Sequence, residues 1–119
     1  MAKELVTDFY QSDALRNAET LNRFLHDEME FDWYSSKGFL KMTKNDLIDL
    51  SNEMNRSYLS SRVHFSHIVQ EDNTVSVRYT YYVTPIESPA EEMILAHFMT
   101  IWEVKDNKLF RGYQMSQLS

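Results

Sequence analysis

The order of the hydrophobic patterns is the feature that most constrains how this chain can fold. Helical spacing of apolar residues occurs in the first half of the sequence, whereas alternation with a period of two dominates from Arg62 onward. The patterns predict two short amphipathic helices, one strand, a third helix and then a run of strands to the C-terminus. Helices and strands that are segregated along a chain favour an α+β fold.

The composition allows one domain over residues 1–119 and argues against several classes of partner. The chain has 43% hydrophobic residues, enough for a real core. Its net charge is −6 and no basic cluster is present, so we expect no nucleic-acid partner. Cysteine is absent, which excludes disulfides and Cys-ligated metals. The first 30 residues are charged throughout and no stretch is long enough to span a bilayer, which predicts a cytoplasmic protein without a membrane partner.

Capping residues mark the predicted helices. Asn17 is placed to accept a hydrogen bond from the amide near Thr20 and so to begin the second helix. Thr43 lies three residues before Asp46, which predicts a capping box at the start of the third helix. The apolar faces expected on the three helices contain Leu5, Val6, Phe9, Tyr10, Ala18, Leu21, Phe24, Leu25, Leu47, Leu50, Met54 and Tyr58.

The predicted strands differ in how cleanly they alternate. In Met29–Ser35 the apolar residues alternate with Glu30, Asp32 and Tyr34, so the two acids are expected to face outward. A hairpin with a turn at 71–73 is expected after the third helix. One face of its first strand would hold Val63, Phe65, His67 and Val69, and one face of its second strand Val75, Val77, Tyr79, Tyr81 and Val83. Two further strands are predicted at Met93–Val104 and Leu109–Gln117.

The stretch from Phe9-Tyr10 through Glu28, read on to Trp33, resembles the opening of the nuclear transport factor 2-like superfamily, which includes SnoaL-like polyketide cyclases and ketosteroid isomerase. The resemblance implies a cone, in which a curved antiparallel or mixed sheet wraps around three N-terminal helices and encloses a pocket. Its implied ligand-binding face holds Trp33, Tyr79, Tyr81, Phe98, Thr100, Trp102 and Gln114, with Gly112 beside them. These residues are mostly aromatic, which is usual in a small-molecule site and in plain core packing.

The catalytic residues of these relatives are absent at the matching positions. The resemblance puts the isomerase base at Trp33, its helix-borne tyrosine at Phe9 and its second aspartate at Thr100. The run Phe110–Tyr113 looks like the Trp-Arg-Asp-Tyr run of limonene-epoxide-hydrolase-like members, but Gly112 replaces the acid. We therefore expect neither steroid isomerisation nor epoxide hydrolysis.

Two other residues could act as a general base. A shift of one residue in the first strand would bring Asp32 to the base position, and His67 could serve if it lines the cavity. Thr100, Gln114 or a tyrosine hydroxyl could then polarise a carbonyl. His64 and His67 are three apart on a strand and face opposite sides, so we expect no metal site, and no cofactor motif is present.

The strand Met93–Val104 is apolar on both faces, so both faces need cover. The three helices can cover only one face of the sheet. We therefore expect a homodimer to form through the other face. The residues expected at that interface are Tyr82, His97, Met99, Ile101, Tyr113 and Met115. Three hypotheses follow: a protein that binds a small apolar or aromatic ligand, a cyclase- or isomerase-type enzyme that uses His67 or Asp32, and a non-catalytic dimeric interaction module whose pocket is filled by its own aromatic side chains.

Overall fold

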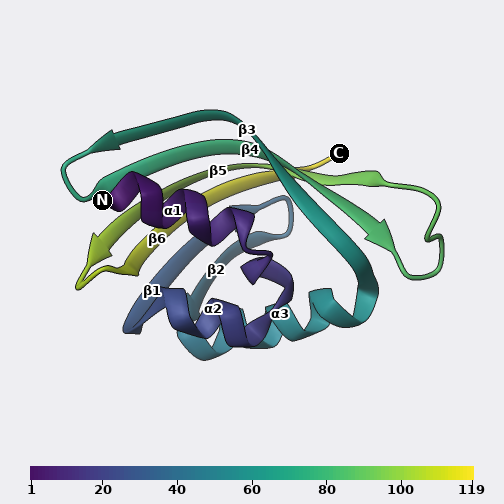
Figure 1. Ribbon diagram of the computed structural model, residues 1–119, viewed down its shortest axis with the longest axis horizontal. Coiled ribbons are helices and arrows are strands. Elements are labelled where there is room, and N and C mark those ends of the chain that lie inside the picture. Colours follow the sequence, from purple (N-terminus) through teal and green to yellow (C-terminus); the bar gives the residue numbers. More distant parts are fainter.

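The computed structural model describes all residues from 1 to 119, and its helices and strands are shown in Figure 1. The helices are α1 (Ala2–Gln11), a short 3-10 helix η1 (Ala14–Arg16), α2 (Ala18–Phe24) and α3 (Lys44–Ser57). The strands are β1 (Leu25–Ser35), β2 (Gly38–Thr43), β3 (Tyr58–Glu71), β4 (Thr74–Pro85), β5 (Met93–Lys105) and β6 (Lys108–Leu118). The predicted α+β class is thus confirmed.

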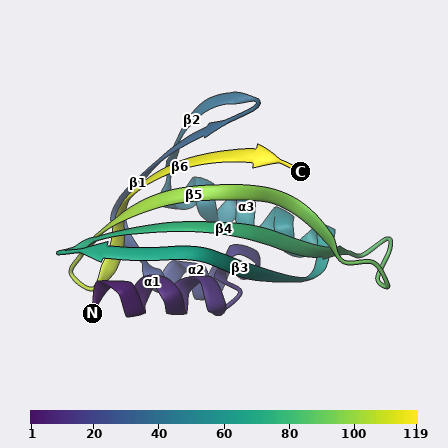
Figure 2. The same ribbon diagram turned by 90° about the horizontal axis from the view of Figure 1, so that it is seen from above.

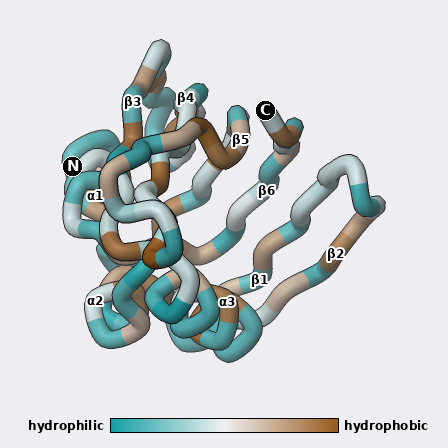
Figure 3. Tube along the Cα trace, turned by 90° about the vertical axis from the view of Figure 1, so that its right-hand side faces the viewer, coloured by the Kyte–Doolittle hydropathy of each residue, from teal (hydrophilic) through white to brown (hydrophobic).

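One six-stranded sheet contains all the strands, in the order β2-β1-β6-β5-β4-β3. The pairing of β1 with β6 is parallel and the other four pairings are antiparallel, so the sheet is mixed. The strands bend strongly along their length (Figure 2). Viewed from the side, the sheet curves from β3 round to β2, and the three α-helices lie within the curve (Figure 3). The expected cone is therefore present.

The predicted caps are confirmed. The Asn17 side chain accepts a hydrogen bond from the Thr20 amide at 3.1 Å, and Thr43 and Asp46 form a reciprocal capping box at the start of α3. The predicted end of α3 is one residue too long, because Tyr58 already has extended backbone angles and begins β3. No helix is long and apolar enough to cross a membrane.

The sequence patterns did not predict β2, which pairs with β1 from Ser35↔Gly38 to Glu30↔Thr43. This edge strand is almost entirely exposed, and Phe39 and Leu40 are both exposed although they point to opposite faces. An edge strand that buries neither face leaves no alternating pattern, and so hydrophobic periodicity could not reveal it.

We predicted that one face of β3 holds Val63, Phe65, His67 and Val69. The prediction is wrong for His67 and Val69. A β-bulge interrupts the β3–β4 ladder between Phe65 and His67. Val63 and Phe65 are half-buried on the concave face, whereas His67 and Val69 pair with Arg78 and Ser76 and are exposed on the opposite face. A bulge adds one residue to one strand and so reverses the alternation beyond it.

A second bulge reverses the start of β5 in the same way. It lies where Tyr81 pairs with Ala96 and Tyr82 pairs with Ile94. Ile94 was expected to share a face with Phe98, but it pairs with the outward-facing Tyr82. Beyond the bulge the expected register holds, and Thr100 and Trp102 are fully buried on the concave face.

Gly112 on β6 gives the rings of Phe31 and Trp102 the space they occupy. A Cβ atom added there would lie 2.7 Å from Cζ3 of Trp102 and closer still to the ring of Phe31. The two rings pack with their centroids 5.3 Å apart, and both are buried. Any side chain at position 112 must therefore displace an aromatic ring.

We expect Gly112→Ala to destabilise the protein by about 1–3 kcal/mol, because an extra carbon atom overpacks this part of the core. Chemical denaturation followed by circular dichroism measures the change. The double variant Gly112→Ala with Phe31→Leu should lose less than the sum of the two single losses, since the smaller side chain makes room. Additive losses would show that the close approach to Phe31 is not the cause.

Candidate functional site

The concave face gathers side chains from β1, β4, β5 and β6. Cross-strand pairing joins Trp33 to Gln114 and Gln114 to Thr100, while Tyr79 pairs with Phe98. Tyr79, Thr100, Trp102 and Gln114 therefore share this face, as the strand periodicity predicted.

A cavity of about 110 Å³ lies between this face and the helices. Six of the seven side chains expected to bind a ligand line it, namely Trp33, Tyr79, Tyr81, Phe98, Trp102 and Gln114. The seventh, Thr100, is buried on the same face but is not part of the lining. Of the sixteen lining residues fourteen are hydrophobic, so the cavity is a largely apolar one.

Ring packing fixes the shape of the cavity wall. The rings of Tyr79 and Phe98 stack, with centroids 5.0 Å apart and planes 16° from parallel. Trp102 contacts Phe9 of α1 edge to face, and its indole Nε1 donates a hydrogen bond to Tyr10 Oη at 2.9 Å. These contacts hold α1 against the sheet and limit how far the rings can move into the cavity.

Most polar groups near the cavity are already paired with each other. Thr100 Oγ1 donates to Gln114 Oε1 at 2.7 Å, and the Trp33 indole Nε1 donates to Ser116 Oγ at 2.8 Å. Ser51 of α3, also in the lining, donates to the Ala14 carbonyl oxygen at 3.2 Å. Paired groups of this kind fix the wall and leave little polarity for a ligand to meet.

The ionisable groups of the cavity are tyrosines. Burial raises the pKa of Tyr10, raises that of Tyr79 well above its usual value, and raises that of Tyr81 to about 12. All three are therefore neutral phenols at physiological pH. No aspartate, glutamate, lysine, arginine or histidine lines the cavity.

The two candidate bases lie outside the cone. Asp32 is on the convex face of β1, where it pairs with Lys41 and Tyr113, while its neighbour Trp33 points inward. His67 is exposed, and its Nδ1 lies 3.0 Å from the hydroxyl of Ser66. The structure thus brings neither residue to the six lining side chains named above.

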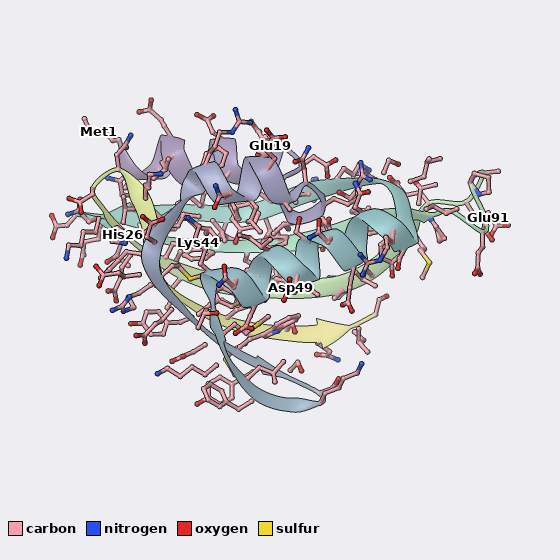
Figure 4. The ribbon with its side chains drawn as sticks, turned by 90° about the horizontal axis from the view of Figure 1, so that it is seen from below. Met1, Glu19, His26, Lys44, Asp49 and Glu91 are labelled. Atoms are coloured by element: carbon pink, nitrogen blue, oxygen red, sulfur yellow. The ribbon has the colours of Figure 1, made fainter.

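Two of the charged side chains on the α-helices also face solvent. Glu19 of α2 and Asp49 of α3 are exposed, and Glu91 lies at the far end of the β4–β5 loop (Figure 4). No group of three or more histidine, aspartate or glutamate residues is placed to hold a metal ion. The chemistry available inside the cone is therefore apolar contact and hydrogen bonding.

Several lining residues were absent from the predicted ligand-binding set. The helices contribute Phe9, Tyr10, Leu15, Leu21, Leu47, Leu50, Ser51 and Met54, and the strands add Phe31 and Leu95. Most belong to the helical apolar stripes, which showed that they are buried but not that they border a cavity. Leu95 faces inward because of the bulge in β5.

Comparison with known proteins gives structural matches only. No protein-family model matches the sequence. No curated protein is significantly similar to it in sequence. IdmH of Streptomyces antibioticus, which carries a provisional polyketide-cyclase assignment, superposes with a TM-score of 0.76 at 12% identity, over 98% of this chain and 91% of IdmH.

Two other solved structures are similar over most of this chain. A Catenulispora acidiphila protein with a ketosteroid isomerase-like fold, in complex with trimethylamine, has a TM-score of 0.70 at 12% identity, over 93% of this chain and 83% of its own. An LEH-like epoxide hydrolase of M. tuberculosis has a TM-score of 0.69 at 16% identity, over 97% of this chain and 81% of the hydrolase chain. The fold is therefore the nuclear transport factor 2-like α+β cone, and a Shewanella denitrificans protein with a provisional SnoaL-like polyketide-cyclase assignment is among its structural neighbours.

Proposed function

We propose that this protein, as one SnoaL-like domain over residues 1–119, binds a small apolar or aromatic molecule inside the cone. The observation that carries the proposal is the cavity of about 110 Å³ with fourteen hydrophobic side chains among its sixteen lining residues. An apolar cavity of about 150 Å³ engineered into another protein binds benzene. The cavity in this protein is smaller, so we expect its ligand to be no larger than a compact single-ring compound.

Binding without acid–base catalysis is the role that the side chains support. Steroid isomerisation and epoxide hydrolysis both need a carboxylate near the substrate. Phe9 and Trp33 line the cavity at the matching positions, Thr100 is hydrogen-bonded to Gln114, and Gly112 has no space for a side chain. The enzyme hypothesis based on His67 or Asp32 lacks support, because neither residue reaches the cavity.

We also propose that two copies associate through the convex face of the sheet. Met99 and Met115 are 59% and 65% exposed there, and the exposed side chains of Ile101 and Tyr113 lie beside them on β5 and β6. Arg78, which forms no ion pair, lies on one side of this apolar patch and Asp32 on the other. A two-fold axis that passes through the patch parallel to the strands would bring Arg78 of each copy to Asp32 of the other. The absence of cysteine suits a cytoplasmic location.

Ligand binding can be tested with α-methylstyrene, a single-ring hydrocarbon. The only two tryptophans, Trp33 and Trp102, both line the cavity, so their indole N–H signals in NMR spectra report its occupancy. We expect saturable shifts of both signals. Met54→Phe fills part of the cavity and should weaken binding about tenfold, because added carbon atoms in a tight site exclude the ligand.

The matched control is Met93→Phe, which makes the same replacement at an exposed position outside the lining. It should bind as wild type does. Shifts that do not saturate, or equal affinities of the Met54 and Met93 variants, would contradict binding in the cone.

Dimerisation can be tested by sedimentation velocity over a range of protein concentrations. We expect wild type to sediment as a dimer at high micromolar concentration, with an interface that buries about 1,200 Å² or more. Met99→Asp should yield monomers, since it puts a charge at the centre of the apolar patch. Leu59→Asp, a similar change at an exposed residue of β3 away from the patch, should stay dimeric. A wild-type monomer would refute the proposal.

A further inference from the structure

One polar side chain in the wall of the cone cavity has a hydrogen-bonding atom that the protein does not use. Fourteen of the sixteen lining residues are hydrophobic, and the other two are Ser51 and Gln114. Ser51 donates its hydroxyl proton to the Ala14 carbonyl oxygen. Gln114 accepts a hydrogen bond on Oε1 from Thr100, and no group of the protein accepts one from its Nε2. Gln114 is therefore the polar group that a molecule in the cavity would meet.

The amide nitrogen of Gln114 is open to the cavity. Arg16 Nε and Tyr81 Oη are the only side-chain polar atoms of the core that lack both a partner and accessible surface, so Gln114 Nε2 keeps some accessible surface. The residue as a whole is only 7% exposed. It lies on the concave face of β6, and the cavity is the space in front of that face. The accessible part of the amide therefore faces the cavity.

Neighbouring hydrogen bonds fix which end of the amide faces the cavity. The Trp102 indole, which can only donate, donates to Tyr10 Oη at 2.9 Å. Burial raises the pKa of Tyr10, and the Trp102 indole and the nearby Thr100 hydroxyl both moderate the rise, so Thr100 Oγ1 is close enough to accept the Tyr10 proton. Thr100 in turn donates its single proton to Gln114 Oε1 at 2.7 Å. The oxygen of the amide is thus directed to Thr100, and the NH₂ group is left for the cavity.

An amide nitrogen differs from a hydroxyl in the partners that it can take. A hydroxyl both donates and accepts, whereas Gln114 Nε2 carries two N–H donors and no acceptor site. Only a hydrogen-bond acceptor on the ligand can therefore pair with it. No lysine, arginine or histidine lines the cavity, so an anionic acceptor would be buried without a counter-charge. The wall of the cavity is consequently suited to a neutral acceptor.

We infer that Gln114 Nε2 donates a hydrogen bond to the ligand, which is a compact single-ring compound that carries a neutral acceptor such as a carbonyl oxygen. The inference rests on the proposed function, because the ring of that ligand occupies the apolar part of the cone. The hydrogen bond directs the acceptor end of the ring toward β6, and apolar contacts alone would leave that direction open.

The role of the amide can be measured with acetophenone and α-methylstyrene, which differ only in a carbonyl oxygen in place of a CH₂ group. Affinities are obtained from the indole signals of Trp33 and Trp102. We expect Gln114→Met, which removes the N–H donors and keeps the length of the side chain, to lower the affinity for acetophenone roughly 3- to 10-fold and to leave that for α-methylstyrene unchanged. Gln117→Met, the same change at an exposed residue of β6 outside the lining, should change neither affinity.

Two further measurements identify the donor and the kind of acceptor. The side-chain NH₂ signals of Gln114, assigned by their loss in Gln114→Met, should move further downfield with acetophenone than with α-methylstyrene. Benzoate, which is close to acetophenone in shape but is charged, should bind more weakly than acetophenone. Tighter binding of benzoate would contradict a neutral acceptor.

The variants also separate binding from stability. Gln114→Met leaves the Thr100 hydroxyl without its acceptor, so its Tm should fall; the double variant Thr100→Val with Gln114→Met removes both partners and should recover most of the loss. The double variant should show the same selective loss of acetophenone affinity.

Three results would overturn the inference while the proposed function stands: equal losses for the two compounds, no loss in either variant, or a gain for acetophenone, which an amide turned the other way would give. If α-methylstyrene fails to bind wild type, the proposed function is wrong and this inference with it.

Discussion

The indole of Trp102 joins α1, β1 and β5 in one packed aromatic cluster. It is fully buried, its ring contacts Phe9 of α1 and Phe31 of β1, and its Nε1 donates to Tyr10. Gly112 on the adjacent strand leaves it the space to do so. A large ring so placed resists displacement in every direction, since each neighbour is itself packed. The concave face, the position of α1 and the shape of the cavity all depend on this contact.

The regular parts of the fold could be predicted from the sequence because each follows one simple rule. The residues Val75, Val77, Tyr79, Tyr81 and Val83 are all buried on β4, as strict alternation requires, and the caps at Asn17 and Thr43 were visible as residue types at fixed spacing. The bulges left no such signal. One extra residue near Ser66 moved His67 from an expected inward position to the convex face, and another brought Leu95 into the cavity.

The cavity itself could be predicted only in part. Six of the expected lining residues were identified from strand alternation and a family resemblance, but alternation tells which face a side chain is on and not whether space remains in front of it. The hydrogen bonds that fix the cavity wall join residues far apart in the sequence, such as Trp33 and Ser116, which are 83 residues apart. Such long-range pairing is decided by the assembled fold.

Xenon binding tests most directly whether the cone is a space for a guest or a core filled by its own side chains. Xenon enters dry apolar cavities and is located without ambiguity by its electron density. Crystals of the protein pressurised with xenon should show it between the sheet and α3, in contact with Phe31, Phe98 and Leu50. Aromatic rings closed over that position, with no xenon in the cone, would contradict the account.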